Sequence, residues 1–113
     1  MAKTASWKPE CDKHGETMII IHDRKGLTEL LRIDADSLDG ADLMGANLEN
    51  ANLVQFSLKH ADLRHANLQH ADLRLADFSD ADLSGANLMG ADITGTIFLN
   101  TNLAGALLPV KND

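Results

Sequence analysis

The sequence has a single cysteine, Cys11, among 113 residues, so it has no internal disulfide framework. Such cysteine usage is typical of a reducing compartment, and we therefore expect a cytoplasmic protein. Tyrosine is absent, and aromatic residues make up only 4% of the chain. This scarcity disfavours a surface on which nucleic-acid bases stack, so we expect no direct nucleic-acid partner.

Long apolar runs are also missing. Met1 to Lys13 contains no apolar stretch of the kind found in secretory signals. The longest obvious run, Met18 to Ile21, is far shorter than the ~20 residues that a membrane-spanning helix needs. The sequence therefore predicts neither a secretory signal nor a membrane partner.

Residues 41–105 are an uninterrupted series of thirteen five-residue units, which we call pentads. Their first position is Ala in ten pentads, their second is Asp in six and Asn in five, and their third is Leu in ten. Five residues advance an α-helix by about 140°, which scatters the Leu side chains around its surface. An odd repeat along a strand would place successive Leu on opposite faces.

A chain that bends at every pentad buries every fifth residue instead. Four bends close a coil of twenty residues, and stacked coils pair as parallel strands about 4.8 Å apart. The first and third positions then point inward, with Ala leaving room at the corners. Asp and Asn at the second position suit turns, and the fifth-position glycines suit positive φ. The predicted core consists of Leu43, Leu48, Leu53, Leu58, Leu63, Leu68, Leu73, Phe78, Leu83, Leu88, Ile93, Phe98 and Leu103, with Phe78 stacked below Phe98.

The pentads, which have the pattern A(D/N)LXX, resemble those of the pentapeptide-repeat family. This resemblance implies an all-β fold, a right-handed, four-sided parallel β-helix. Some members of that family bind type II topoisomerases by imitating DNA. The resemblance therefore implies one alternative function, a DNA mimic that binds DNA gyrase.

The remaining chain divides around the repeats. We expect a polar N-terminal tail at 1–16, a capping segment at 17–33, a β-helix of about four coils at 34–110 and a C-terminal tail at 111–113. Thr17 to His22 is predicted to form a strand. Two interpretations remain for residues 23–33: Asp23 begins a short helix carrying Leu27, Leu30 and Leu31, or Leu31 and Ile33 are inward residues of a degenerate pentad.

Charge is distributed unevenly along the chain. Residues 1–33 carry a net charge of +1 and residues 34–113 a net charge of −8, which gives the −7 of the whole chain. Asp42, Asp62 and Asp82 form a predicted acidic interaction face, for which repeated turn chemistry is the simpler explanation. Eight charges over a stack about 19 Å tall give roughly 0.4 per Å, against about 0.6 per Å in duplex DNA.

Basic residues and histidines gather in one predicted coil, which contains Lys59, His60, Arg64, His65, His70 and Arg74. We expect the cations to offset neighbouring carboxylates. The histidines lie at successive corners, roughly 10 Å apart, too far for shared metal ligation. Cys11, His14 and His22 have a metal-like spacing but no carboxylate partner. The sequence therefore predicts no catalytic, cofactor-binding or metal-binding residue, and no cofactor.

Apolar residues occupy outward positions near the C-terminal end of the repeats, at Ile97, Leu99 and Leu107. With no capping segment predicted there, the last coil exposes its core residues and its strand edges. The sequence predicts a concentration-dependent homodimer through this coil, with an interface made of Ile97, Phe98, Leu99, Leu103, Leu107 and Leu108. In the alternative, Pro109 and Val110 close the end and the chain is a monomer.

The function that these features favour is a non-catalytic structural or protein-interaction module, built on a rigid acidic solenoid, whose protein partner is unidentified. The alternatives are the gyrase-binding DNA mimic and a metal or redox protein that uses the N-terminal tail.

Overall fold

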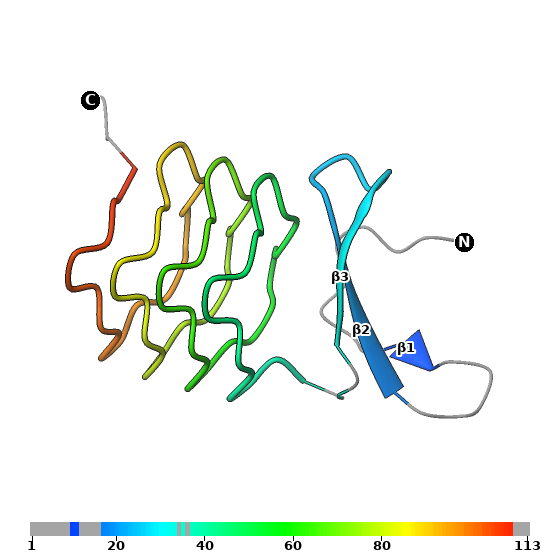
Figure 1. Ribbon diagram of the computed structural model, residues 1–113, viewed down its shortest axis with the longest axis horizontal. Helices are drawn as coiled ribbons and strands as arrows, with labels where there is room; N and C mark the ends of the chain where they lie inside the picture. Colours follow the sequence, from blue (N-terminus) through cyan, green and yellow to red (C-terminus); the bar gives the residue numbers. More distant parts are fainter. Residues whose placement is uncertain (1–9, 12–16, 34, 36, 110–113) are drawn as a thin grey trace.

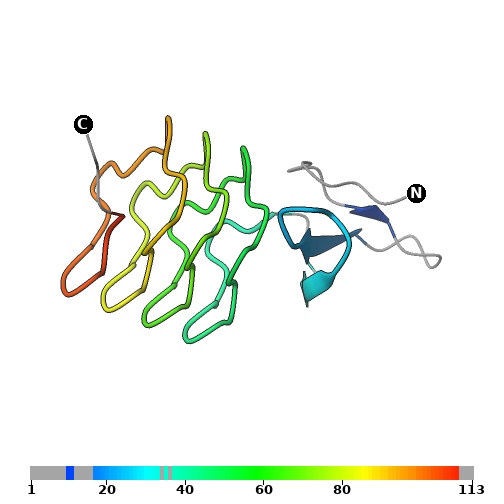
Figure 2. The same cartoon turned by 90° about the horizontal axis from the view of Figure 1, so that it is seen from above.

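The computed structural model describes residues 10–11, 17–33, 35 and 37–109. A small antiparallel sheet precedes a stack of coils, and the two are arranged along one axis (Figures 1 and 2). The sheet has the strand order β1-β2-β3, with β1 at Glu10–Cys11, β2 at Thr17–His22 and β3 at Glu29–Ile33. The predicted tails at 1–16 and 111–113 lie outside the described residues, apart from β1.

The pentads wind into coils in which each second-position residue pairs in parallel with the residue twenty positions away. These residues form four columns, one for each pentad of the twenty-residue period, and the coil is therefore four-sided. The columns are Asp42–Asp62–Asp82–Asn102, Asn47–Asn67–Asn87–Leu107, Asn52–Asp72–Asp92 and Ser57–Asp77–Ile97.

Backbone hydrogen bonds hold each coil to the next. The N–H of Leu63 donates to the carbonyl of Asp82 at 2.8 Å, and the N–H of Asp82 donates to the carbonyl of Ala61 at 3.0 Å. Within the coil, the N–H of Ala66 donates to the carbonyl of Leu63 at 3.0 Å, which closes the corner. The same pattern recurs through the stack, so an identical pentad finds an identical backbone partner at every level.

The core is a column of third-position side chains. The residues from Leu48 to Leu88 at this position are all 0% exposed, and the first-position alanines from Ala51 to Ala91 are buried beside them. Phe78 and Phe98 stack as predicted, with ring centroids 5.7 Å apart and an interplanar angle of 6°. Toward the C-terminal end the burial weakens. Ile93, Phe98 and Leu103 are half-buried, and Leu108 is 45% exposed.

Every described fifth-position residue from Gly40 to Gly105 has a positive φ, between 56° and 75°. The expectation for the glycines is thus confirmed, but the same conformation also holds at larger residues. Leu75 is the most unusual of these residues. It has a bulky apolar side chain, yet its φ is 62° and that side chain is 55% exposed. Left-handed conformations cost non-glycine residues about 1–2 kcal/mol. The coil geometry therefore overrides local preference at these corners.

Replacement by Ala should destabilise the protein by different amounts at two of these glycines. Gly45 has φ +70° and nothing within 4 Å of an added Cβ, whereas a Cβ on Gly85, at φ +71°, would lie 2.5 Å from Nδ1 of His65. Gly45→Ala should cost about 1–2 kcal/mol of unfolding free energy through its dihedral alone. Gly85→Ala should cost about 0.5–1.5 kcal/mol more, because the imidazole must leave its rotamer.

Urea unfolding of both variants measures this difference. Adding His65→Ala should remove the extra cost at Gly85 and change nothing at Gly45. Equal losses in the two single variants would show that the imidazole of His65 does not occupy the space above Gly85.

The segment after β2 corrects the sequence interpretation. The strand predicted at Thr17–His22 is confirmed, but the predicted helix from Asp23 is wrong. Oδ1 of Asp23 does accept the N–H of Leu27 and of Thr28, at 2.8 and 3.2 Å, but within a turn that contains Gly26 at φ 75°. The chain then pairs as β3 with the free edge of β2.

The alternative interpretation is wrong as well. Leu31 and Ile33 belong to β3, where they pair antiparallel with Ile21 and Ile19 rather than occupying a pentad. Both are half-buried and pack against the core. Apolar residues spaced three and four apart do not distinguish a short helix from a strand when the segment lies beside an open strand edge.

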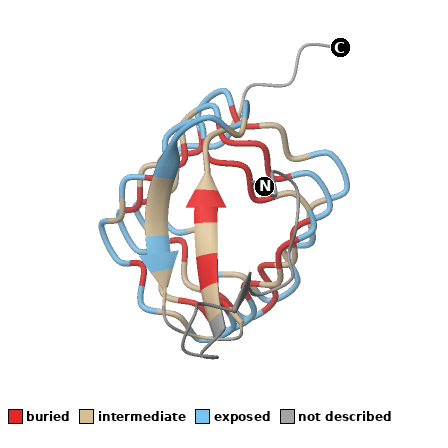
Figure 3. Ribbon diagram, turned by 90° about the vertical axis from the view of Figure 1, so that its right-hand side faces the viewer, coloured by how far each residue is buried: buried red, intermediate tan, exposed pale blue. Residues whose placement is uncertain are grey.

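The hairpin, by which we mean residues 17–33, lies across the first coil (Figure 3). The N–H of Asn52 donates to the carbonyl of His22 at 2.8 Å, and the N–H of Arg24 donates to the carbonyl of Asn50 at 2.7 Å. Ile19 and Ile21 are 2% and 0% exposed and belong to the same apolar core as the leucine column. One face of β2 thus covers the N-terminal end of that column.

Candidate functional site

The side chains on the outside of the stack are fixed by the backbone that carries them. Every second-position Asp and Asn of residues 41–105 accepts, through Oδ1, the N–H of the residue two positions ahead. These acceptors are Asp42, Asn47, Asn52, Asp62, Asn67, Asp72, Asp77, Asp82, Asn87, Asp92 and Asn102. The outer surface is therefore a set of regularly spaced, oriented polar groups.

The acidic column of Asp42, Asp62 and Asp82 carries a cation in its middle. Arg64 binds Asp62 through two hydrogen bonds, of 2.8 Å from Nε and 2.7 Å from Nη2. This pairing lowers the pKa of Asp62, and Asp62 in turn raises the pKa of Arg64, with smaller contributions from Asp82 and Asp42. Arg64 thus pairs within its own pentad, and its charge offsets part of the column.

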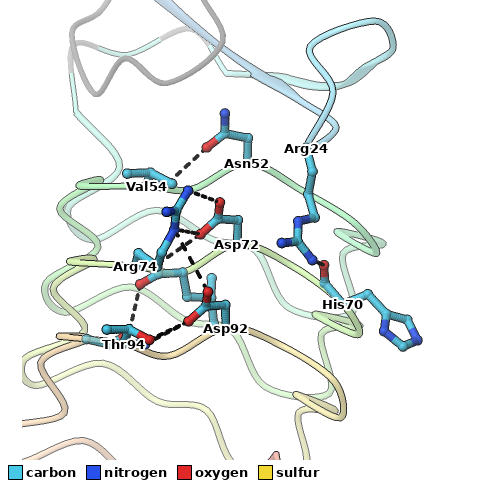
Figure 4. A network of polar contacts seen from close by, with 10 residues as sticks. Arg24, Asn52, Val54, His70, Asp72, Arg74, Asp92 and Thr94 are labelled. Carbon is cyan, nitrogen blue, oxygen red and sulfur yellow. Dashed lines mark hydrogen bonds and ion pairs between the residues drawn. The ribbon is translucent and has the colours of Figure 1, made fainter.

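A second column repeats this arrangement on the opposite side of the four-sided stack (Figure 4). Arg74 binds Asp72 with two hydrogen bonds of 2.7 Å, and its Nε lies 4.0 Å from Oδ2 of Asp92. The pKa of Asp72 is lowered, chiefly by this hydrogen bonding, while that of Asp92 is lowered chiefly by the hydroxyl of Thr94. Arg24 from the hairpin donates to the carbonyl of His70 at 3.1 Å, which ties the hairpin to the side of the stack.

Lys59 offsets a third column, because its Nζ lies 3.8 Å from Oδ2 of Asp77. The pKa of Asp77 is lowered, first by the hydroxyl of Ser79 and to a lesser extent by Lys59. Each of the three cations therefore faces a different column at nearly the same level of the stack. The expected pairing of the basic coil with carboxylates is what the geometry shows.

The lowered carboxyl pKa values predict a loss of stability in acid. Asp62, Asp72, Asp77, Asp82 and Asp92 each have a folded pKa below the unfolded value of about 3.9. Their contribution is present above that unfolded pKa and is lost as the pH falls through the folded pKa. We expect the midpoint of thermal unfolding to be level from pH 7 to about pH 5 and to fall steeply below about pH 4.

Asparagine provides the matched control, since it keeps the turn acceptor but cannot titrate. Asp62→Asn with Asp82→Asn should be less stable than wild type at pH 7, where the Arg64 pair is lost, and should show a shallower acid transition. An acid transition as steep as that of wild type would mean that these carboxyls do not contribute to it.

The histidines do not come together as a site. The imidazole of His65 lies against Gly85 and that of His70 against Gly90, one coil farther on. His60 lies apart from both, with Nε2 at 3.9 Å from Oδ2 of Asp80. Within the described residues, no group of three or more His, Cys, Asp or Glu is placed to hold a metal ion. His14 and the side chain of Cys11 lie outside the described part of the chain.

A shallow hollow at the Arg24 corner is lined by residues 90–95 together with Arg24 and Pro109. The hydroxyl of Thr94 donates to Oδ1 of Asp92 at 2.7 Å. That hydroxyl is the only one among the lining residues, and the carboxylate it faces has a lowered pKa. Among its described lining residues, no nucleophile is therefore paired with a base that titrates near neutral pH.

The predicted interface residues gather at the C-terminal end of the stack. Ile97, Leu99 and Leu107 are 45%, 63% and 53% exposed, and Phe98 and Leu103 are half-buried between them. Ile97 follows Asp77 in its column and Leu107 follows Asn87, so the two residues lie on opposite sides of the stack. The apolar side chains therefore ring this end rather than form one lateral patch.

Part of the backbone at this end has no hydrogen-bond partner among residues 37–109. Phe78, Asp80, Leu83 and Gly85 each donate an N–H to the carbonyl nineteen residues ahead. Within residues 37–109, the corresponding N–H groups one coil later have no hydrogen-bond partner; they belong to Phe98, Asn100, Leu103 and Gly105. The carbonyls of Thr96, Thr101 and Ala106 likewise accept no hydrogen bond from a described residue. We call residues 96–108 the C-terminal edge.

Sequence reasoning missed two features of this site. Thr96 and Thr101 replace the first-position Ala, and their hydroxyls donate to the carbonyls of Leu73 and Phe78, both at 2.6 Å. It also missed Arg24, which reaches the stack from the hairpin. The break from Ala to Thr was visible in the sequence, but its hydrogen-bond acceptor became apparent only with the coil register.

Comparison with known proteins agrees with this geometry. The family described as pentapeptide repeats matches residues 41–80 and 72–108. No curated protein matches the chain. In the described part of the chain, no helix is long and apolar enough to cross a membrane.

Several solved structures are similar to the repeats. The pentapeptide-repeat protein Rfr23 from the cyanobacterium Cyanothece 51142 is 42% identical over 63% of this chain, with a TM-score of 0.51. The chain spans about half of Rfr23, 51% of its length. HetL, a pentapeptide-repeat protein involved in heterocyst differentiation regulation from the cyanobacterium Nostoc sp. strain PCC 7120, is 35% identical over 64% of this chain and 40% of its own, with a TM-score of 0.42.

A third similar structure is a pentapeptide-repeat protein from the thylakoid lumen of Arabidopsis thaliana. It is 27% identical over 62% of this chain and 59% of its own, with a TM-score of 0.34.

Proposed function

Because this chain belongs to the pentapeptide-repeat family, whose fold is a four-sided β-helix, we propose that it is a non-catalytic interaction module that presents a rigid acidic surface to a protein partner. The family is generally structural rather than enzymatic. We also propose the finer features of the fold: a right-handed stack of about four coils, with the hairpin acting as its N-terminal cap. A cytoplasmic location is part of the same proposal.

The observation that carries this proposal is the fixation of the outward side chains. Each second-position Asp or Asn is held by a backbone N–H of its own pentad, so its orientation is set before any partner arrives. A surface whose groups are already ordered loses little side-chain entropy on binding. Regular spacing and fixed orientation suit the recognition of a folded protein surface.

The carboxyl groups argue in the same direction. Asp62, Asp72 and Asp82 have lowered pKa values and remain ionised at neutral pH. General acids and bases need pKa values near the working pH, so these groups are suited to charge recognition rather than to proton transfer.

A matched pair of variants tests the proposal. The triple variant Asp42→Asn, Asp62→Asn and Asp82→Asn removes one column of charge but keeps the turn acceptors, and Asp72→Asn with Asp92→Asn does the same for another column. We expect affinity capture from a lysate of the source organism to retain a protein that one of these variants loses and the other keeps. Identical retention by wild type and both variants would contradict recognition through the acidic columns.

The second candidate is a DNA mimic that binds DNA gyrase, and the acidic columns are the observation that favours it. Three paired cations, Lys59, Arg64 and Arg74, interrupt those columns midway and lower the resemblance to a row of phosphates. A supercoiling assay with purified gyrase distinguishes the two. We expect no inhibition and no protection at micromolar protein, whereas inhibition that the triple Asn variant abolishes would support the DNA mimic instead.

A further inference from the structure

Arg24 shows how a corner of the stack binds a guanidinium group (Figure 4). Its backbone N–H donates to the carbonyl of Asn50 at 2.7 Å, and its Nη1 donates to the carbonyl of His70 at 3.1 Å. Both acceptors are fifth-position residues, so Arg24 binds two successive levels of one corner. After the hydrogen bonds within their own pentads, the charge of Arg24 also contributes to the lowered pKa values of Asp72 and Asp92. This corner thus offers a cation both carbonyl and carboxylate groups.

The fifth-position carbonyls are available for such contacts because the stack does not use them. From Gly40 to Gly105, no fifth-position carbonyl accepts a backbone hydrogen bond from another pentad. Only those of Asn50 and His70 accept a hydrogen bond from a described residue, and Arg24 is the donor in both cases. A surface carbonyl without a protein donor is hydrogen-bonded to water, which the donor of a partner can replace.

The same polar framework occurs on the opposite side of the stack, because ten residues are half of the twenty-residue period. The corresponding residues there are His60 for His70, Asp62 for Asp72, Arg64 for Arg74, Asp82 for Asp92 and Ser84 for Thr94. Arg64 binds Asp62 through two hydrogen bonds, as the corresponding pair does. The carboxylate of Asp82 accepts the N–H of Ser84 at 3.0 Å, and its counterpart accepts the corresponding N–H at 3.1 Å.

Two differences make the side of His60 suited to an external cation. No described residue donates to the carbonyl of His60. Asp80 stands where the other side has Gly90; its carboxylate lies 3.9 Å from Nε2 of His60, and its side chain is 47% exposed. Among the described residues, neither Asp80 nor Asp82 forms an ion pair with lysine or arginine. This side thus has one more carboxylate than the side that Arg24 binds.

We propose that the carbonyl of His60 and the carboxylates of Asp80 and Asp82, which we call the His60 corner, bind an arginine side chain of a protein partner. Its guanidinium donates to the carbonyl of His60, as that of Arg24 does on the opposite side. A planar guanidinium with five donors binds a carbonyl and a carboxylate together, so the corner prefers arginine to lysine. This inference rests on the proposed function and names the chemistry of the partner.

Titration of the isotope-labelled chain with the peptide acetyl-Gly-Arg-Gly-amide, followed by amide NMR shifts at constant ionic strength, tests the His60 corner. We expect saturable shifts at residues 60–64 and 80–84, with a dissociation constant of about 1–10 mM for this single side chain. The peptide acetyl-Gly-Lys-Gly-amide has the same charge and should bind about threefold more weakly or less tightly still.

A matched pair of double variants separates local from overall charge. Asp80→Asn with Asp82→Asn removes two carboxylates from the His60 corner and should weaken binding of the arginine peptide about fivefold or more. Asp72→Asn with Asp92→Asn removes the same charge from the opposite side and should leave binding at residues 60–64 unchanged.

Arg24→Ala provides a second, independent measurement. It removes the guanidinium that binds the carbonyl of His70, so the arginine peptide should produce a further set of saturable shifts at residues 70–74. The amide spectrum of this variant also reports whether the stack stays folded. If it does not, the two double variants still decide.

The proposal is overturned if the arginine peptide causes no saturable shift at residues 60–64. It is also overturned if the lysine peptide binds there equally well, or if Asp80→Asn with Asp82→Asn leaves binding unchanged. Retention of a partner from the lysate is a separate readout. Loss of that partner from the triple Asn variant, without peptide binding, would leave the proposed function standing, whereas peptide binding without such a loss would leave only the His60 corner.

Discussion

Phe78→Ala should lower the free energy of unfolding by about 3–5 kcal/mol, the range observed when a buried aromatic ring is removed. Phe78 is 0% exposed, and its ring stacks on that of Phe98. The hydrogen bonds that join each coil to the next fix the positions of the surrounding backbone. The stack therefore cannot collapse into the gap, and most of the cavity cost remains.

Chemical denaturation monitored by circular dichroism measures this loss. Leu75→Ala is the control on the neighbouring pentad, because Leu75 is 55% exposed and its loss should cost well under 1 kcal/mol. If Phe78→Ala unfolds at the same denaturant concentration as Leu75→Ala, the third position does not form the core.

Ile21→Ala should cost about 2–5 kcal/mol, because Ile21 is 0% exposed and joins the hairpin to the leucine column. The neighbouring hydrogen bond from Asn52 to the carbonyl of His22 depends on the same contact surface. Losing that surface should weaken the attachment of the whole hairpin, and the pentads nearest to it should then fray first.

Ile20→Ala is the matched control for the hairpin. Ile20 follows Ile19 on the same strand, points to the other face and is only half-buried, so its replacement should cost less than half as much. Comparable losses at the two positions would contradict the proposal that one face of β2 caps the stack.

How far the sequence predicted the structure depends on whether a feature arises from the repeat. The burial of Leu63 and the stacking of Phe78 under Phe98 result from a period of five and a coil of twenty, and both are observed. The positive φ at Gly85 has the same origin. These features depend on register alone, and thirteen consecutive pentads define that register without ambiguity.

Features that depend on a single contact were not predicted. Residues 29–33 form β3 because β2 presents an open edge, a tertiary fact that the spacing of Leu27, Leu30 and Leu31 does not contain. The sequence predicted that Arg64 offsets a neighbouring carboxylate but not which one. Its side chain folds back to Asp62, where two hydrogen bonds form at once. The donation from Thr101 to Phe78 needs the register of two coils before it can be seen.

Amide hydrogen exchange, measured by NMR residue by residue, tests the stacked coils most directly. The N–H groups of Leu63, Leu68 and Leu83 should exchange slowly, because each donates to a carbonyl of the next coil of the stack. The N–H groups of Phe98, Leu103 and Gly105, for which no described residue provides an acceptor, should exchange faster. Fast exchange at Leu63 and Leu68 would contradict the stacked coils themselves.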